Sequence, residues 1–222
     1  MKILAIDAAT EACSAALLLD GEVAERYEVI GRGHADRLLP MADELLREAG
    51  LAAQDLDAFA FGRGPGGFTG LRISAGIAQG LAAGSGRPIL PVSNLAAVAA
   101  LAARVSQQSQ VLVCMDARMG QVYWAAFDCS GAAPVALTAE LLSNPAEVLA
   151  PPGERWFGAG HGFALASIAG ALGPRLAGRD SSLLPRAGDI ARIAAIDFAA
   201  GKGVPAARGL PVYLRDDVVH RR

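Results

Sequence analysis

The feature that most constrains the fold of this chain is a pattern that occurs once in each half. The first copy, LAIDAATEACSAALLLDG, has an apolar run, then Asp7-Ala8, a short turn and a second apolar run that ends near a glycine. The second copy, VCMDARMGQVYWAAFDCSG, has the same order around Asp116-Ala117. Apolar runs of this length bounded by turn residues are typical of buried strands. Two copies of one supersecondary unit predict an internal repeat, and therefore two similar lobes.

The patterns of the first half predict the order β-β-β-α-β-α-β-α. The first three strands form an antiparallel meander, because Asp20-Gly21 is a strong hairpin turn signal. The helix after His34 has its apolar residues on one face and ends at Gly50. The expected strands are 3–6, 13–19, 22–30, 56–61 and 88–92, and the other expected helices are 70–83 and 94–105.

The second half is expected to begin in the same way and to form a lobe of its own. A polar stretch rich in Ser and Gln, residues 104–110, predicts the boundary. The expected domains are therefore 1–106, the N-terminal lobe with partner-binding helices, and 107–222, the C-terminal lobe. Strands are expected at 111–115, 121–127 and 135–138 and around Trp156-Phe157, and a helix at 189–200 with Asp189 as its N-cap.

Bulk composition indicates a globular protein without a nucleic-acid or membrane signature. The chain has 222 residues and a formal net charge of −2, with acidic and basic residues interspersed. Its three cysteines form no C-x-x-C pair, which favours reduced thiols in a cytosolic protein. The apolar run at the N-terminus is interrupted by Asp7 and does not resemble a signal peptide. We therefore expect a soluble, cytoplasmic protein.

The glycine-rich stretch GRGPGGFTGLR, residues 62–72, raises the question of a phosphate site. It formally matches G-x-G-x-x-G, but the next strand ends at Val92-Ser93 without the acidic residue of a dinucleotide site. Two interpretations stay open. Gly66, Gly67 and Thr69 contact an anion at the start of the next helix, with Thr69 as its cap. Alternatively, the stretch is a tight turn.

Asp7 and Asp116 have two interpretations as well. Each follows a first strand, where nucleotide-handling folds place a metal or phosphate contact, and we count Asp7 as a candidate contact. The alternative is a turn-forming aspartate that accepts backbone N–H groups. The histidines, His34, His161 and His220, show no short metal spacing, so the sequence contains no obvious reactive set.

Two helices are candidates for contact with another protein. Gly76, Gly80 and Gly84 recur every four residues and so share one helix face. Glycine in a helix interior costs about 1 kcal/mol relative to alanine, which is tolerated where another backbone comes close. That backbone belongs either to the chain's own sheet or to a partner helix. The helix after His34 has an unusually broad apolar face, formed by Leu38, Leu39, Met41, Leu45 and Leu46.

Six stretches, in order along the chain, resemble the bacterial TsaB (YeaZ) family. They are ILAIDAATEACSAAL, HADRLLP, FGRGPGGFTGLRISAGIAQGLA, PVSNLAAVA, DARMGQVYWAAF and PVYLRDD. The resemblance implies an α/β, two-lobed fold of the actin, sugar-kinase and Hsp70 class, which is ribonuclease H-like and built from duplicated units. It also implies a role in forming threonylcarbamoyladenosine in tRNAs that read codons starting with A.

The same resemblance implies a non-catalytic subunit with several partners. These are the paralogous transferase TsaD, which it activates, the ATPase TsaE, and tRNA through the complex. We also expect a homodimer, because an exposed helical seam left without its partner would pair with its own copy. The H-x-x-x-H metal site of TsaD-like paralogs corresponds here to Asn94 and Val98, so we expect no metal. ATP is used by the complex, and no cofactor is assigned to this chain, nor any role to Cys114 or Arg118.

The resemblance also indicates which surface is used. The expected interface comprises His34, Leu38, Leu39, Met41 and Leu45 from one helix, and Leu71, Ser74, Gly76, Ile77 and Gly80 from the other. The glycine-rich stretch is then best interpreted as a tight turn that aims the second helix. Two alternatives remain: an independent phosphotransferase or peptidase that depends on Asp7, and a self-associating structural protein.

Overall fold

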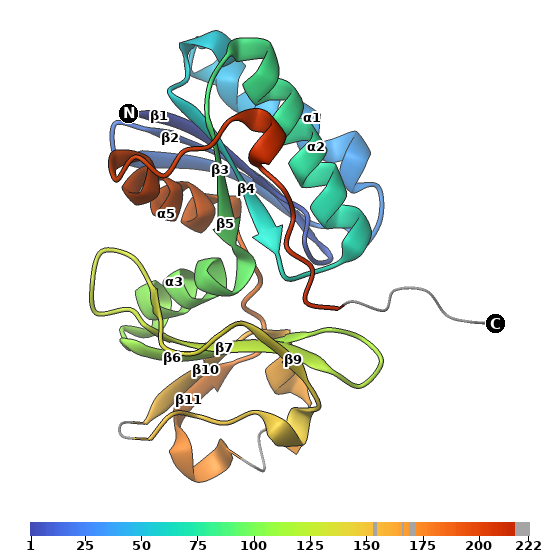
Figure 1. Ribbon diagram of the computed structural model, residues 1–222, viewed down its shortest axis with the longest axis vertical. Helices are drawn as coiled ribbons and strands as arrows, with labels where there is room; N and C mark the ends of the chain where they lie inside the picture. Colours follow the sequence, from blue (N-terminus) through green and yellow to red (C-terminus); the bar gives the residue numbers. More distant parts are fainter. Residues whose placement is uncertain (153–154, 166, 169–171, 216–222) are drawn as a thin grey trace, which may run out of the picture.

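The computed structural model describes residues 1–152, 155–165, 167–168 and 172–215, and it shows two α/β lobes that each contain one sheet (Figure 1). The first sheet has the order β3-β2-β1-β4-β5. The second has the order β11-β10-β6-β7-β8, with β9 also paired to β7. The strands of the first sheet are β1 Lys2–Asp7, β2 Ala12–Leu19, β3 Glu22–Val29, β4 Ala58–Gly64 and β5 Ile89–Ser93. Those of the second are β6 Gln110–Asp116, β7 Val122–Asp128, β8 Val135–Ala136, β9 Leu141–Ser143, β10 Trp156–Ala159 and β11 Leu176–Asp180.

The helices follow the order that the sequence predicts. The α-helices are α1 His34–Glu48, α2 Phe68–Ser85, α3 Asn94–Ser106 and α5 Ala187–Ala199. The short 3₁₀ helices are η1 Ala53–Asp55, η2 Pro145–Glu147, η3 His161–Ala164, η4 Gly173–Arg175 and η5 Ala206–Arg208. No helix among these described residues is long and apolar enough to cross a membrane. The charged residues after Arg215 lie outside the described residues, and so does His220, the third of the histidines considered above.

The two sheets have the same connectivity, which confirms the predicted repeat. β1 pairs antiparallel with β2 and parallel with β4. β6 likewise pairs antiparallel with β7 and parallel with β10. Asp7 and Asp116 therefore occupy equivalent positions, at the ends of the central strands of the two sheets. The predicted two-lobed fold of the actin, sugar-kinase and Hsp70 class is confirmed.

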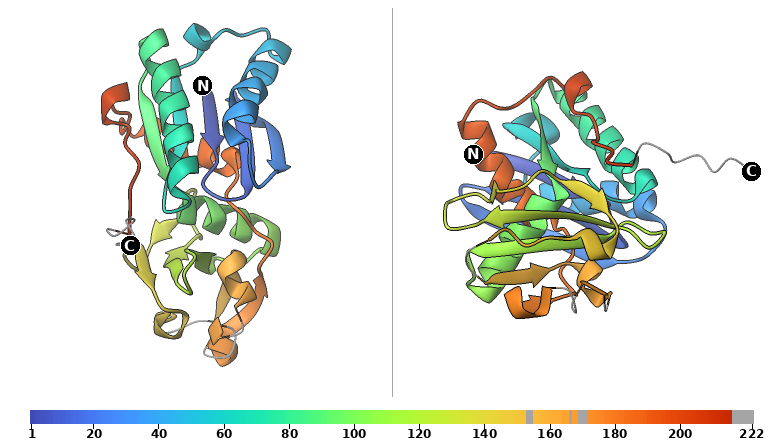
Figure 2. Two further views of the ribbon diagram at one scale, coloured as in Figure 1. Left: turned by 90° about the vertical axis from the view of Figure 1, so that its right-hand side faces the viewer. Right: turned by 60° about the horizontal axis from the view of Figure 1, so that its bottom comes forward.

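The first sheet is covered by helices on both faces. Successive side chains of a strand point to opposite faces, so β1 contributes to both packing layers. Leu4 and Ile6 pack with α1 and α2, whereas Ile3 and Ala5 pack with α5. Figure 2 shows α1 and α2 side by side on the same face of this sheet. α3 lies between the two lobes, where Val98 packs against the second sheet and Ala97 against the α5 layer (Figure 1).

The chain crosses back to the first lobe after β11. α5 follows the second lobe in sequence but packs on the first sheet, where Ile190 and Ala191 are fully buried. Residues 200–213 continue along the same lobe, and Val204 exchanges two backbone hydrogen bonds of 2.9 Å with Ile89 of β5. The boundary that we propose at residue 106 thus separates the two sheets, but it assigns α5 to the lobe on which it does not pack.

The predicted N-cap of α5 is wrong. The helix begins at Ala187 with Arg186 as its cap residue, and Asp189 lies in the first turn. Asp189 is buried and accepts two hydrogen bonds of 3.1 Å from Arg104 of α3. Burial raises the pKa of Asp189, and the Arg104 guanidinium opposes that rise. Asp189 therefore connects α5 to α3 instead of capping its own helix.

Candidate functional site

Asp7 forms the centre of a buried hydrogen-bond cluster where β1, β4 and α3 meet. Its carboxylate accepts a hydrogen bond of 2.6 Å from Asn94 Nδ2 and one of 3.2 Å from the Ala9 N–H. Asn94 Oδ1 in turn accepts the N–H of Gly64 at 2.7 Å. The turn interpretation of Asp7 is thus supported by its bond to Ala9. Because Asp7 has 0 % of its surface exposed, our expectation that it contacts a ligand is wrong for this conformation.

The same cluster explains Gly62. A Cβ atom at this position would overlap Asp7 Oδ1 and lie 2.5 Å from Asn94 Nδ2, so only glycine leaves room for the pair. Burial raises the pKa of Asp7 to about 6, although its hydrogen bonds to Asn94 and Ala9 act in the opposite direction. The two side chains hold the end of β1 against the start of α3.

The glycine-rich stretch is a close contact between backbones. The Gly67 N–H donates to the Ala9 carbonyl at 2.7 Å, and a Cβ atom on Gly66 would lie 2.6 Å from the same oxygen. A Cβ atom on Gly70 would overlap the Ala8 carbonyl oxygen. Gly67 is the cap residue of α2, and Thr69 lies within the helix, so the predicted Thr69 cap is wrong. These contacts favour the tight-turn interpretation, because the Gly67 N–H is already occupied.

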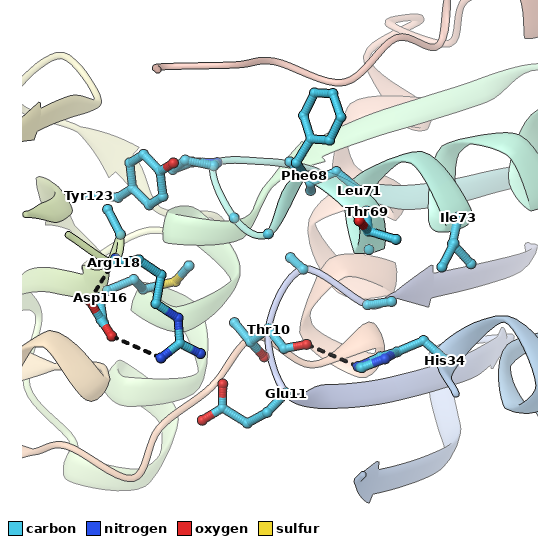
Figure 3. Close-up of a pocket in the computed structure, with 18 of the residues that line it drawn as sticks. Thr10, Glu11, His34, Phe68, Thr69, Leu71, Ile73, Asp116, Arg118 and Tyr123 are labelled. Atoms are coloured by element: carbon cyan, nitrogen blue, oxygen red, sulfur yellow. Dashed lines mark hydrogen bonds and ion pairs between the residues drawn. The ribbon is translucent and has the colours of Figure 1, made fainter. Parts of the chain in front are cut away.

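A cleft of about 1360 Å³ lies between the lobes (Figure 3). Its walls are the turn after β1, the start of α1, the glycine-rich turn, the turn after β6 and the C-terminal segment; they include Gly66, Gly67 and Thr69. These three residues remain predicted anion contacts. Asp116, the counterpart of Asp7, also lines this cleft and accepts a hydrogen bond of 2.8 Å from the Arg118 N–H.

Charged groups from both lobes line the cleft. Figure 3 shows Glu11 of the first lobe and Arg118 of the second on facing walls, and Arg118 Nη1 lies 3.5 Å from Asp116 Oδ2. His161, which begins η3, has a buried Nδ1 atom that finds no hydrogen-bond partner among the described residues. Burial lowers the pKa of His161, which keeps its ring neutral near pH 7. No sequence pattern connects His161 to Asp116, so its position in this cleft could not be predicted.

The sequence assigns no chemistry to His34 or to the three cysteines. His34 Nε2 contacts the Thr10 carbonyl at 3.0 Å, which ties α1 to the turn after β1. Burial raises the pKa of the Cys114 thiol well above its usual range, and all three cysteines are free. Within the described parts of the chain, no three His, Cys, Asp or Glu side chains are grouped so as to hold a metal ion. Asn94 and Val98 are both fully buried.

The glycine face of α2 is open to solvent. A Cβ atom on Gly76, Gly80 or Gly84 would meet no atom of the part of the chain that the structure describes within 4 Å. The alternative that these glycines pack on the chain's own sheet is therefore wrong. α2 carries a single charged residue, Arg72, although one side of the helix is exposed. A surface helix usually presents charged residues to water, so this face is unusual for a helix without a partner.

Half of the predicted interface residues do not reach this surface. Five of the ten are buried in the core of the first lobe and support the helices from beneath: Leu38, Met41, Leu45, Leu71 and Ser74. They cannot touch a partner in this conformation, because three of them form the core side of α1 and the other two form the core side of α2. The other five, His34, Leu39, Gly76, Ile77 and Gly80, are exposed or half-buried, and Leu39 exposes 49 % of its surface. We call the exposed residues of α1 and α2 the outer face.

Known proteins resemble this chain, and one of them does so over its full length. Residues 26–196 match the protein family described as "TsaD: tRNA N6-adenosine threonylcarbamoyltransferase". The tRNA threonylcarbamoyladenosine biosynthesis protein TsaB of Escherichia coli K12 is 41% identical over 229 aligned residues, covering 100% of this chain and 98% of that protein. The protein of the same name from Haemophilus influenzae is 51% identical over 124 residues, covering 56% of this chain and 52% of that protein.

A solved structure shows the same architecture. The protein described as "YeaZ from Pseudomonas aeruginosa" superposes with a TM-score of 0.88 at 44% identity, covering 96% of this chain and 99% of that one. The repeated sheets and the cleft between them define a two-lobed protein of the actin, sugar-kinase and Hsp70 class. Within that class, the chain belongs to the TsaB (YeaZ) family, as its sequence motifs predict.

Proposed function

We propose that this chain takes part in the biosynthesis of threonylcarbamoyladenosine in tRNAs that read codons starting with A. Its role is that of a non-catalytic subunit that binds and activates the paralogous transferase TsaD, together with the ATPase TsaE. Full-length similarity to a protein named for this pathway supports the pathway. tRNA and ATP enter through the assembled complex.

The observation that carries the subunit role is the open glycine face of α2. Two exposed interior glycines, Gly76 and Gly80, lower helix stability without any packing gain inside the chain. Small residues let the backbone of a second helix approach closely. The neighbouring Leu39 of α1 adds exposed apolar surface, of the kind that a partner helix covers. The outer face therefore fits an α-helical partner surface.

The cluster around Asn94 supports a non-catalytic role. At the position where TsaD-like paralogs have a metal-binding histidine, Asn94 uses its amide to hold Asp7 and the Gly64 N–H. The second position, Val98, packs in the core between α3 and the second sheet. Both residues thus serve the fold of this chain.

Partner binding can be tested with Gly80→Leu. The side chain enters open space, so the isolated chain folds, but it blocks close approach of a helix and abolishes binding to TsaD. Ala199→Leu is the matched control, because it adds the same side chain to an exposed position of α5 on the opposite face of the sheet. Binding is measured by calorimetry with the purified proteins. Normal binding by Gly80→Leu contradicts the assignment of the outer face.

The same face also predicts self-association. A partner-binding surface left uncovered tends to pair with its own copy, so a homodimer is the resting form that competes with the heterodimer. Gly80→Leu therefore also makes the isolated chain monomeric in sedimentation experiments, whereas Ala199→Leu does not.

A further inference from the structure

The C-terminal segment, residues 209–215, lies along the first lobe and ends on the second. We call this segment the strap. On the first lobe, the Val212 N–H donates to the Arg63 carbonyl at 2.7 Å, and Gln79 Nε2 of α2 donates to the Gly209 carbonyl at 2.9 Å. These bonds fix the strap to the end of β4 and to α2. Figure 1 shows the strap in red, descending from the first lobe toward the level of the second.

Aromatic and cationic contacts hold the next residue on the same lobe. Arg72 Nε of α2 donates to Tyr213 Oη at 3.1 Å. The Arg72 guanidinium also stacks on the Phe68 ring, 3.6 Å from its centroid. The centroids of the Phe68 and Tyr213 rings lie 5.3 Å apart. Cation–π stacking of this kind adds to the hydrogen bonds of the strap. Residues 209–213 therefore belong structurally to the first lobe.

The next two residues bind the second lobe. Leu214 packs against the core that covers the second sheet. Arg215 Nη2 donates to the Ala117 carbonyl at 3.1 Å, in the turn after β6. Arg215 Nη1 also lies 3.6 Å from Met119 Sδ. Two neighbouring residues of the strap, Tyr213 and Leu214, thus contact opposite walls of the cleft.

An ion pair connects the lobes beside the strap. Arg63 Nη2 of β4 lies 3.0 Å from Glu140 Oε1, which comes just before β9 of the second lobe. The two side chains expose only 25% and 14% of their surface, so water screens this pair less than a fully exposed pair. Arg63 takes part in both connections, because its carbonyl accepts the Val212 N–H.

We propose that the strap and the Arg63–Glu140 pair form a clamp that fixes the angle between the two lobes. Two-lobed proteins close and open by hinge motion unless contacts across the cleft prevent it. Here the connecting residues themselves line the cleft, from Val212 to Arg215. The clamp keeps the cleft at one width, so that the two lobes behave as one rigid body. This inference does not depend on the proposed function.

The clamp can be tested by measuring the distance between the lobes in solution. Spin labels are placed at Asp43→Cys on α1 and Ala132→Cys in the second lobe, both exposed, in a Cys129→Ser background. Cys13 and Cys114 are fully buried and stay unlabelled. Pulsed electron paramagnetic resonance then gives the distribution of distances between the labels.

Glu140→Ala and Arg215→Ala each remove one connection. The matched controls are Glu147→Ala, because Glu147 accepts the Asn144 N–H within the second lobe, and Arg87→Ala, because Arg87 donates to the Gln54 carbonyl within the first. Loss of a hydrogen bond to a charged group shifts a two-state equilibrium about tenfold. Each variant therefore increases the population of other lobe angles about tenfold, and the double variant increases it further.

The expected result is a broader distance distribution for the double variant and an unchanged one for both controls. A double variant with the distribution of the parent chain overturns the clamp. Far-UV circular dichroism establishes that each variant is folded. If the double variant does not fold, Glu140→Ala alone decides the question, because it leaves the strap intact: a distribution as narrow as the parent's refutes the proposal.

Discussion

The glycines of α2 lead to a prediction in which stability and partner binding change in opposite directions. Replacing Gly76 and Gly80 with alanine places two methyl groups where nothing lies within 4 Å. Alanine is about 0.8–1.0 kcal/mol more favourable than glycine in a helix interior. Both positions are well inside Phe68–Ser85, so the double variant should gain about 2 kcal/mol in the free energy of unfolding.

The same methyl groups should weaken binding to TsaD. They occupy the space that the outer face offers to a second helix, and overpacking a close contact costs about 1–3 kcal/mol. We therefore expect the dissociation constant to rise about tenfold or more, although the isolated chain becomes more stable. Urea unfolding followed by circular dichroism gives the stability, and isothermal titration calorimetry with TsaD gives the affinity.

Gly70→Ala is the matched control for the gain in stability. It is the same substitution in the same helix, but its Cβ atom would overlap the Ala8 carbonyl oxygen. We expect it to destabilise the chain by about 1–3 kcal/mol. Two results refute the reasoning. A loss of stability in the Gly76→Ala/Gly80→Ala variant shows that the face is not open, and an unchanged affinity shows that the glycines do not lie at the interface.

The buried cluster and the α3–α5 contact give three further predictions, all measurable by urea unfolding. Burial raises the pKa of Asp7 from 3.8 to about 6, so protonation of Asp7 stabilises the folded state. This stabilisation is present below pH 4 and is lost as the pH rises through 6. The loss is about 3 kcal/mol, and the stability difference between the parent and Asp7→Asn should change by that amount from pH 4 to 7; a constant difference contradicts the shifted pKa. Asn94→Ala leaves the Asp7 carboxylate and a backbone N–H without their partner and should cost about 2–4 kcal/mol, whereas a neutral effect shows that the cluster contributes little. Arg104→Ala removes the partner of the buried Asp189 carboxylate and should cost about 1–2 kcal/mol at pH 7, because Arg104 is itself half exposed; Arg104→Lys should restore part of it.

Much of the fold could be predicted from local patterns. Apolar runs bounded by turn residues identified the strands, and Asp20-Gly21 marked a hairpin in which both residues have positive φ. The repeated Asp-Ala after a first strand predicted two sheets of equal connectivity. These features depend on residues close together in the sequence, so they can be predicted from the sequence of one protein.

The errors concern contacts between distant segments. Periodicity shows that Leu38, Met41 and Leu45 share a face of α1, but it does not show whether that face meets the sheet or a partner. The structure assigns it to the sheet. Asp189 has the residue type of an N-cap, yet it lies one turn too deep and pairs with Arg104, which is 85 residues away.

The cleft could not be predicted for the same reason. Its walls come from seven separate segments, and His161 contributes to them only because η3 follows β10. The strap contacts depend on Arg215 reaching Ala117 across 98 residues, and no sequence pattern connects the two. Local spacing carries no information about such pairs, whereas the open glycine face could be anticipated, because four-residue spacing defines a helix face by itself.

Reconstitution of threonylcarbamoyladenosine synthesis tests the proposed role most directly. Cognate TsaD, TsaE, the synthase that makes threonylcarbamoyl-adenylate, tRNA, ATP, threonine and bicarbonate are combined with and without this chain. We predict modified tRNA only when the chain is present, none with the chain alone, and none when Gly80→Leu replaces it. Equal modification without the chain, or turnover by the chain alone, contradicts the role of an activating subunit.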